Sequence, residues 1–349
     1  MFWEETEREH RMKKILIILL VVLVVLSGCG TKQFAKGPAD VVYVLASKEV
    51  KESLQTAIDT TFSFGIRTPE FQRYFSTDWR PLNEMNRYIY FPNTIIIADL
   101  NRNDAASHFV KGLLSQERLE SIKKDTVAML ALPDTWRRLQ MLVMVAGYDM
   151  EKLASFVMER QGWLFSKFNQ KYIERQSKYI FNQHEQKNLE KRLWEDYNWT
   201  LRIPSDYVVI REYPNRNFIW LGRALPYRWI SISWANGIKT KWLTANGLFD
   251  KREKIGELYR QIRTEERFLG HKFVKLGDRD ALRMYGLWYH EDKAQGGPFV
   301  TYAFYDEHSD RTFVVDMMVF APREKSINYI RQMEIMTQTF RTTEQDDQS

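Results

Sequence analysis

Short apolar runs alternate with amphipathic stretches along the first half of the chain. Apolar residues at helical spacing predict a helix over residues 48–58, with Ser47 as its N-cap. They also predict a second helix, which carries Leu113, Leu114, Leu119 and Ile122. Buried strands are predicted at four apolar runs, residues 41–45, 94–98, 127–132 and 139–145. Strands interleaved with helices in this way predict a mixed α/β sandwich.

A long stretch without proline follows, from Asp149 to Tyr197. Apolar residues such as Leu153, Leu164 and Phe168 recur in it at helical spacing, so we predict one long helix or two successive helices ending near Trp194. The first domain is therefore expected to span residues 39–198.

The pattern changes after residue 198, where period-two alternation becomes common. Helices are predicted over residues 251–268 and 327–340, and a hairpin turn over 306–310. The expected strands cover residues 207–210, 218–221, 229–234, 281–289, 299–305 and 312–320. The second domain is then an antiparallel sheet packed by helices over residues 199–341, followed by a polar, disordered tail over 342–349. The predicted fold class is α+β.

The start of the chain carries a sorting signal. Basic residues precede twelve apolar residues, Ile15–Leu26, and Leu26-Ser27-Gly28-Cys29 follows directly. This order is typical of a secretory signal, and the apolar run is shorter than the roughly 20 residues that span a bilayer. Because Cys29 stands at the cleavage site, residues 1–28 are predicted to be a lipoprotein signal peptide and Cys29 the lipidated residue. The alternative is a core element at 15–26 with Cys29 buried beside it.

Lipidation would tether the protein to a membrane through residues 29–38. Each buried methylene of an acyl chain contributes about 0.8 kcal/mol, so two or three chains give a lasting anchor. Gly30 is not the Asp that retains lipoproteins at the inner membrane, and no acidic cluster follows Cys29. We therefore expect the outer membrane, with the periplasmic face favoured over the cell surface. Met12 fits the start of this signal better than Met1.

Charge and cysteine content narrow the function classes. The net charge of +6 is small for 349 residues, and acidic and basic residues are interleaved, so no nucleic-acid partner is expected. The single Cys excludes disulfides within the chain and Cys-based metal centres once it carries lipid. No cofactor is expected.

The last third of the chain resembles a known family. The segments that carry the resemblance are Gly286-Leu287-Trp288-Tyr289, Gly296-Gly297-Pro298-Phe299, Val319-Phe320-Ala321-Pro322 and Arg331-Gln332-Met333-Glu334. With the lipoprotein signal, they are similar to Bacteroidetes-type cell-envelope lipoproteins whose mature region is a domain of unknown function. The resemblance implies an envelope lipoprotein without established catalytic residues. The order of elements in the second domain also looks like the PsbP and Mog1 group, which consists largely of binding and assembly factors.

Aromatic residues are dense in the second domain and form one candidate ligand site. Amphipathic rings suit a glycan or a protein partner, whereas the alternation of several of them suits core packing. Gly296-Gly297 could form a backbone nest for an anion or simply a tight loop. The candidate ligand-binding residues are Trp220, Trp229, Trp234, Trp288, Tyr289, Gly296 and Gly297.

A second candidate site combines imidazoles and acids. His290 and Asp292 follow one predicted strand and His308 follows another, so they could converge on a metal or act as a general base. Loops rich in solvated charge are the alternative explanation, and no hydrolase, phosphate-loop or dinucleotide motif is present. We therefore predict a non-catalytic binding or envelope-assembly module; the alternatives are an envelope hydrolase using these residues and a structural spacer.

Overall fold

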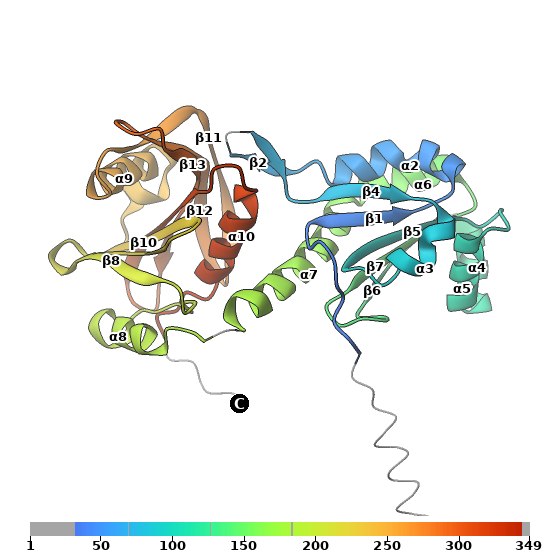
Figure 1. The fold of residues 1–349 in the computed structure, drawn as a ribbon, viewed down its shortest axis with the longest axis horizontal. Coiled ribbons are helices and arrows are strands. Elements are labelled where there is room, and N and C mark those ends of the chain that lie inside the picture. Colours follow the sequence, from blue (N-terminus) through green and yellow to red (C-terminus); the bar gives the residue numbers. More distant parts are fainter. Residues whose placement is uncertain (1–31, 69, 126, 183, 344–349) are drawn as a thin grey trace, which may run out of the picture.

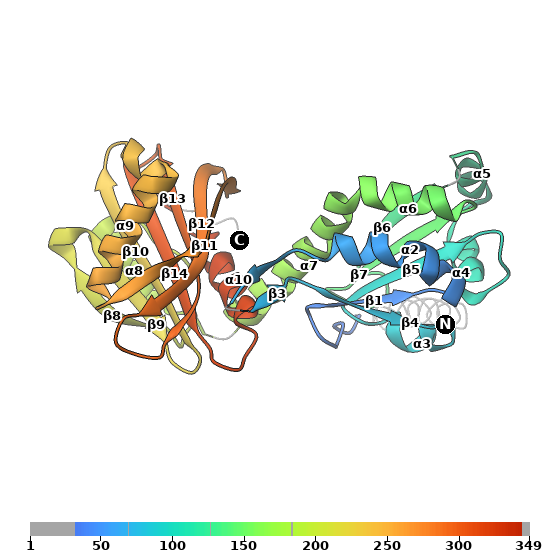
Figure 2. The same cartoon turned by 90° about the horizontal axis from the view of Figure 1, so that it is seen from above.

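The computed structural model describes residues 32–343, except residues 69, 126 and 183. The chain forms two units, joined by the helix α7 (Gln161–Phe181) and by a hairpin (Figures 1 and 2). The predicted signal peptide and Cys29 lie outside the described residues, as does most of the predicted tail. No helix within residues 32–343 is both long and apolar enough to span a membrane.

The first unit is built on a five-stranded sheet. Its strands, in spatial order, are β4 (Ser76–Arg80), β1 (Val41–Leu45), β5 (Asn93–Asp99), β7 (Met141–Gly147) and β6 (Val127–Pro133). All pairs are parallel except β6 with β7. β5 and β7 are buried along almost their whole length, as expected of parallel strands covered on both faces. The four predicted strands are present; β4 was not predicted.

Helices cover both faces of this sheet. On one face pack α2 (Lys48–Thr61), α6 (Met150–Glu159) and α7; on the other lie α3 (Met85–Tyr88), α4 (Ala105–Leu113) and α5 (Gln116–Asp125). The prediction of one helix through Leu113 and Leu119 was wrong, because extended backbone at Leu114 separates α4 from α5. The Ser47 hydroxyl accepts a hydrogen bond from the Val50 amide at 3.4 Å, so the predicted N-cap is confirmed.

The predicted helical stretch over residues 149–197 is three helices, and the prediction of one or two was wrong. Non-helical backbone at Arg160 separates α6 from α7, and residues 182–186 separate α7 from α8 (Lys187–Tyr197). The apolar spacing looked continuous because each helix has its own buried face. Leu193 of α8 packs in the core of the second unit. The predicted boundary at residue 198 therefore separates α8 from the core to which it contributes.

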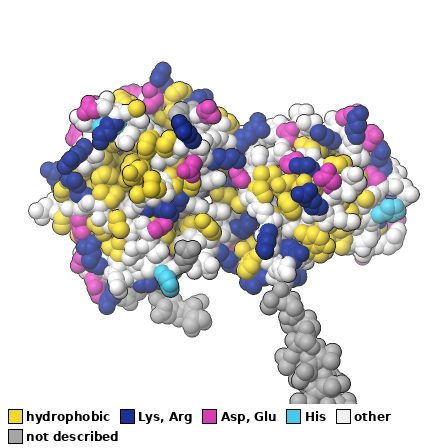
Figure 3. Space-filling model, viewed as in Figure 1, with side chains coloured by type: hydrophobic (Ala, Val, Ile, Leu, Met, Phe, Trp, Pro, Cys, Tyr) yellow, Lys and Arg dark blue, Asp and Glu magenta, His cyan; other side chains and the backbone are white. Residues whose placement is uncertain are grey.

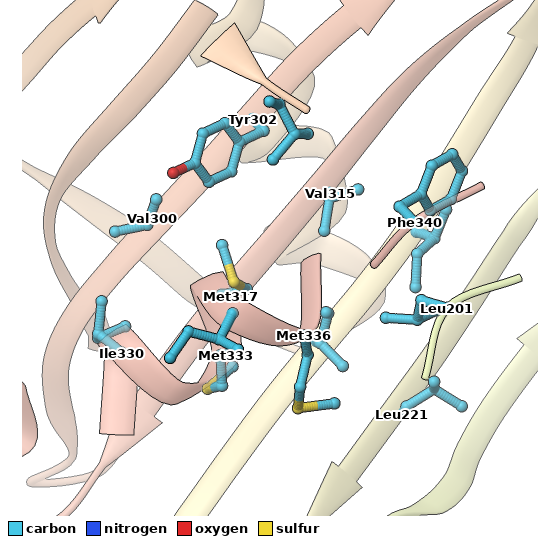
Figure 4. Packing of buried hydrophobic residues seen from close by; sticks show 14 of the residues in the cluster. Leu201, Leu221, Val300, Tyr302, Val315, Met317, Ile330, Met333, Met336 and Phe340 are labelled. Carbon is cyan, nitrogen blue, oxygen red and sulfur yellow. The ribbon is translucent and has the colours of Figure 1, made fainter. Parts of the chain in front are cut away.

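The second unit is a seven-stranded antiparallel sheet. In spatial order its strands are β11 (Ile262–Leu276), β12 (Arg279–His290), β13 (Gly296–Asp306), β14 (Arg311–Phe320), β10 (Tyr227–Asn236), β9 (Phe218–Arg223) and β8 (Val208–Tyr213). One face packs against α8 and α10 (Ser326–Thr337), where Met317, Met333 and Met336 meet (Figure 4). The other face packs against α9 (Ala245–Leu258). The predicted α+β class, with helices on an antiparallel second sheet, is confirmed.

The predicted helix over residues 251–268 was wrong in its second half. α9 ends at Leu258, and Arg260 and Gln261 have positive φ of 68° and 58°, which no helix continues through. Ile262 then starts β11, pairing with His290. Ile262 lies in the same core cluster as Ile255 of α9, and this is why the helical pattern seemed to continue past the turn.

The two units are linked by contacts that the sequence analysis did not foresee. The hairpin of β2 (Gly65–Arg67) and β3 (Phe71–Arg73) leaves the first unit and lies beside the second (Figures 1 and 2). Its Gln72 side chain accepts a hydrogen bond from the Ile327 amide of α10 at 3.0 Å. Further along α10, the Arg331 guanidinium donates to the Tyr74 carbonyl.

Candidate functional site

A groove of about 1020 Å³ lies where the two units meet. Its floor comes from the second unit, at the end of β12, the start of β13 and the end of β14. The β2–β3 hairpin and the bulged part of β11 form its sides. Apolar lining residues are Phe268, Leu287, Trp288, Phe320, Ala321 and Pro322, and we call this site the groove throughout. The predicted residues Trp288, Tyr289, Gly296 and Gly297 all line it.

The two glycines shape the floor of the groove by close backbone packing. Gly296 and Gly297 lie in β13 and pair with Tyr289 and Trp288 of β12. A Cβ on Gly297 would stand 2.1 Å from the Val319 carbonyl oxygen. That same oxygen accepts a hydrogen bond at 3.1 Å from the buried indole of Trp288. Because both glycines are paired in a strand, the interpretation as an anion nest was wrong.

A bulge in β11 forms one side of the groove. The pairing of β11 with β12 shifts between Glu265 and Gly270, which bends the edge strand outward. Within the bulge, the Arg267 guanidinium donates two hydrogen bonds to the Glu265 carboxylate, at 2.9 and 2.8 Å, and lowers its pKa to about 2. The Arg67 guanidinium of the hairpin stacks over the Phe268 ring at 4.7 Å, so a contact between the units closes this side.

An aromatic strip continues from the groove across the sheet. Its members lie on the α9 face of the sheet and are Trp288, Phe320, Tyr227, Trp229, Trp220 and Ile210. Adjacent rings touch: the centroids of Trp288 and Phe320 are 6.3 Å apart, and those of Trp229 and Tyr227 are 5.5 Å apart. Across six strands at about 4.8 Å spacing, the strip is roughly 24 Å long.

Part of the aromatic strip is open to solvent. Tyr227 is 39% exposed and Ile210 is also 39% exposed, while Tyr289 at the groove is 43% exposed. Leu225, in the turn before Tyr227, is 81% exposed. Figure 3 shows hydrophobic side chains gathered on the visible face of the second unit, with Lys and Arg side chains around them. Clustered exposed apolar side chains of this kind mark binding surfaces more often than isolated ones do.

Trp234 does not belong to this site. It is buried on the opposite face of the sheet, where its ring meets Trp199 at 5.5 Å and Tyr197 at 5.0 Å. Of the four predicted tryptophans, the structure therefore brings together Trp220, Trp229 and Trp288, and uses Trp234 as core.

The charges at the rim of the groove are mixed. Lys325 pairs with Asp40 of the first unit at 3.0 Å, and Arg267 pairs with Glu265. Lys293 and Arg323 are exposed and form no ion pair within the described part of the chain. Glu70 and Glu324 also line the groove without an ion pair among the described residues, so its apolar floor is bordered by charges of both signs.

The structure does not assemble the predicted hydrolase site. His290 ends β12, and His308 lies in the turn after β13, at the far end of that strand. Ten strand steps of about 3.3 Å place the two turns roughly 30 Å apart. Asp292 is exposed, and its amide donates a hydrogen bond to His290 Nδ1 at 3.1 Å, which is a local turn contact. Among the described residues, no group of three His, Cys, Asp or Glu side chains could hold a metal ion.

Several residues of the site were missed at the sequence level. Phe268 was assigned to a helix, Phe320 to a core strand, and the hairpin at residues 65–73 to an unassigned polar stretch. The apolar residues around the turn, Leu225-Pro226-Tyr227, were a usable signal, because exposed apolar residues in a hairpin are uncommon.

Comparison with known proteins identifies a domain in the second unit. A family described as "Domain of unknown function (DUF4837)" matches residues 186–339, which include α8, the whole antiparallel sheet and α10. A domain of unknown function is therefore confirmed. No curated protein matches the chain significantly.

Solved structures show only distant similarity. A protein from Bacteroides thetaiotaomicron is 10% identical with a TM-score of 0.27; the match covers 44% of this chain and 47% of that one. The Ran-binding protein Mog1p from Saccharomyces cerevisiae is 11% identical (TM-score 0.29; 42% and 90% covered). LpqN from Mycobacterium tuberculosis, involved in cell envelope biogenesis, is 12% identical (TM-score 0.27; 41% and 81% covered). TM-scores of this size do not establish a common fold.

Proposed function

We propose that this protein is a lipid-anchored binding module of the cell envelope. Its groove and aromatic strip would receive an extended apolar segment of a partner protein. Cys29 would carry the anchor, and the periplasmic face of the outer membrane is the proposed location, both on the strength of the sequence signal.

The observation that carries the binding role is the continuity between the groove and the aromatic strip. Together they offer an apolar path across six strands that ends between the two units. A purely structural spacer would not need the exposed apolar side chains of Tyr227, Ile210 and Leu225, because exposed apolar groups lower the solubility of a protein. Aromatic anchors that are half-buried before binding are typical of the centres of protein interfaces.

The orientation of the rings favours a protein segment over a glycan. The planes of Tyr227 and Trp229 meet at 23°, and those of Tyr227 and Phe320 at 26°, so the rings stack on one another. Both ring pairs are stacked, whereas sugar stacking needs a ring face that no neighbouring ring covers. Apolar side chains can pack against the exposed ring edges.

Site-specific photo-crosslinking in intact cells tests this function. A benzophenone amino acid at Tyr289 should give one adduct of discrete mass, whereas the same group at Phe273, which is 75% exposed on β11 away from the strip, should not. Tyr227→Glu should abolish the adduct by burying a charge in the interface. The matched change Tyr179→Glu, at a tyrosine 70% exposed on α7, should leave it intact.

Equal crosslinking from Tyr289 and Phe273, or an adduct that survives Tyr227→Glu, would contradict the binding role. The anchor is tested separately by feeding cells an alkyne-labelled fatty acid. Label should enter the wild-type chain and be absent from Cys29→Ala; equal labelling of both would refute lipidation at Cys29.

A further inference from the structure

A second cavity, of about 270 Å³, lies between the units on the α10 side of the sheet. The first unit contributes Tyr74, Asn169 and Tyr172 to its lining. The second unit contributes Lys272, Arg283 and Arg331 among others, and none of these six residues lines the groove. The cavity is therefore a site of its own, bounded by both units.

Like charges face each other in this cavity. Lys272 of β11 is directly opposite Arg283 of β12, and Arg283 is directly opposite Tyr302 of β13. Two cations at directly opposed positions of neighbouring strands repel each other and destabilise the pair. Glu334 supplies one negative charge that acts on both side chains, which leaves one of the two cations without a counterion.

One carboxylate lines the cavity, and its Oε1 atom accepts two hydrogen bonds. Glu334 of α10 accepts a hydrogen bond from Arg283 Nε at 2.8 Å and another from the Tyr302 hydroxyl at 2.7 Å. Lys275, which also lines the cavity, pairs with Asp280 at 2.8 Å. Lys272 has no ion pair within the described residues.

Arg331 adds a second cation that forms no ion pair within the described residues. It is 5% exposed, its guanidinium lies 3.3 Å from the centroid of the Tyr172 ring, and it donates to the Tyr74 carbonyl at 3.0 Å and to Asn169 Oδ1 at 2.7 Å. No carboxylate of the described chain forms an ion pair with it. A buried charge without a counterion costs several kcal/mol of desolvation, and a bound anion would offset that cost.

Burial is the main cause of the pKa shifts of these two cations. Burial, followed by the charge of Arg283, lowers the pKa of Lys272 below its usual value. Burial also lowers the pKa of Arg331. Glu334 neutralises Arg283. The two remaining cations, Lys272 and Arg331, each add one positive charge to the lining of the cavity.

We propose that this cavity binds a compact oxyanion, a phosphate or sulfate group, which bridges the two units. Lys272 supplies a charged donor from the second unit, and the Arg331 guanidinium supplies positive charge where the units meet. A cavity of 270 Å³ accommodates one such group with its first waters, and is small for a whole nucleotide.

Isothermal titration of the intact soluble chain, from residue 32 onward, with inorganic phosphate at constant ionic strength tests the proposal. Saturable 1:1 binding is expected, and Lys272→Met should weaken it at least tenfold. Lys272 is largely exposed, so this variant should fold. The matched change Lys111→Met, at an exposed lysine of α4 in the first unit, should leave the affinity unchanged.

The proposal is overturned if no saturable heat appears up to about 10 mM phosphate. It is also overturned if Lys272→Met and wild type bind equally, which would indicate a general salt effect. Competition then assigns the natural source: displacement of phosphate by glycerol 3-phosphate indicates a soluble ligand, and displacement by phosphatidylglycerol vesicles indicates a lipid headgroup. Since neither Tyr289 nor the aromatic strip takes part, failure here leaves the groove's function untouched.

Discussion

At the scale of single residues, Gly297 determines whether the floor of the groove can form. Any side chain there meets the Val319 carbonyl oxygen, which must stay free to accept from the Trp288 indole. The backbone has an ordinary extended conformation, so the requirement comes from steric contact with β14 and not from a left-handed φ. The glycine is needed because an indole from β12 reaches across β13 to β14.

Gly297→Ala should therefore destabilise the fold by about 1 to 3 kcal/mol, because the 2.1 Å contact forces β13 or β14 to shift. Urea denaturation monitored by tryptophan fluorescence measures the change in the free energy of unfolding. Gly162→Ala is the matched control, because this glycine lies in α7 and nothing is within 4 Å of the added Cβ. Alanine there should raise the free energy of unfolding by up to about 1 kcal/mol. Similar free energies for both variants would disprove the steric role of Gly297.

At the scale of elements, the sequence predicted those whose pattern is local. Four of the five strands of the first sheet, all except β4, and the β12, β13 and β14 meander follow from apolar runs and alternation. β11 was missed because it is an edge strand with charged residues over much of its length, and only Ile262, Thr264 and Leu276 are buried. The β2–β3 hairpin was missed since its stability comes from contacts with the other unit, which no local pattern encodes.

Contacts between distant segments leave no local sequence pattern, and this also limits what could be predicted of the site. Trp288, Tyr289, Gly296 and Gly297 were found because aromatic and glycine residues stand out in a strand sequence. Alternation places Trp234 on the opposite face of its strand from Trp229, but which of the two faces carries the site depends on how helices cover the sheet. The cavity between Lys272 and Arg331 requires the arrangement of both units. Lys272 was not singled out in the sequence, and Arg331 was noted only in a segment that carries the family resemblance.

The carboxylate of Glu185 links the start of α8 to the loop that follows this helix. The free energy of unfolding should therefore depend on pH. Glu185 accepts two hydrogen bonds from the Arg202 guanidinium, both at 2.9 Å, and its side chain is 11% exposed. The hydrogen bonds from Arg202 and then from Lys187 lower the pKa of Glu185 to about 2, against the effect of burial. Because the folded pKa lies below the unfolded value near 4.5, Glu185 stabilises the fold fully above about pH 5.5. This contribution is lost as the pH falls from about 4.5 to 2.

Glu185→Gln should therefore lower the free energy of unfolding by about 1 to 3 kcal/mol at pH 7, and the difference from wild type should shrink steadily between pH 5 and pH 3. Urea denaturation at pH 7, 5 and 3 measures it. Glu52→Gln, at an exposed position on α2, should differ little from wild type at every pH. A difference for Glu185→Gln that stays constant down to pH 3 would show that the ion pair is not responsible.

At the scale of the whole molecule, the two units are held in one arrangement chiefly by α10. This helix is part of the core of the second unit through Ile330, Met333 and Met336, while its polar side chains reach the first unit. Gln332 donates to Gln176 at 2.8 Å, in addition to the contacts of Arg331 and the Ile327 amide. The groove and the second cavity, which lies between Lys272 and Arg331, each have walls from both units. Their shapes therefore depend on these few contacts.

Arg331→Ala should separate the unfolding of the two units. The variant loses the guanidinium stacked on Tyr172 and two hydrogen bonds to the first unit, which we expect to cost about 2 to 4 kcal/mol. Differential scanning calorimetry should then resolve two transitions where the wild type shows one, and small-angle X-ray scattering should show a larger radius of gyration. Lys325→Ala removes an exposed ion pair between the units, Lys325 with Asp40, and should change the unfolding free energy by less than about 1 kcal/mol and leave a single transition. If Arg331→Ala also unfolds in one step with unchanged dimensions, the units are coupled through the β2–β3 hairpin and α7, and α10 is not the element that holds them together.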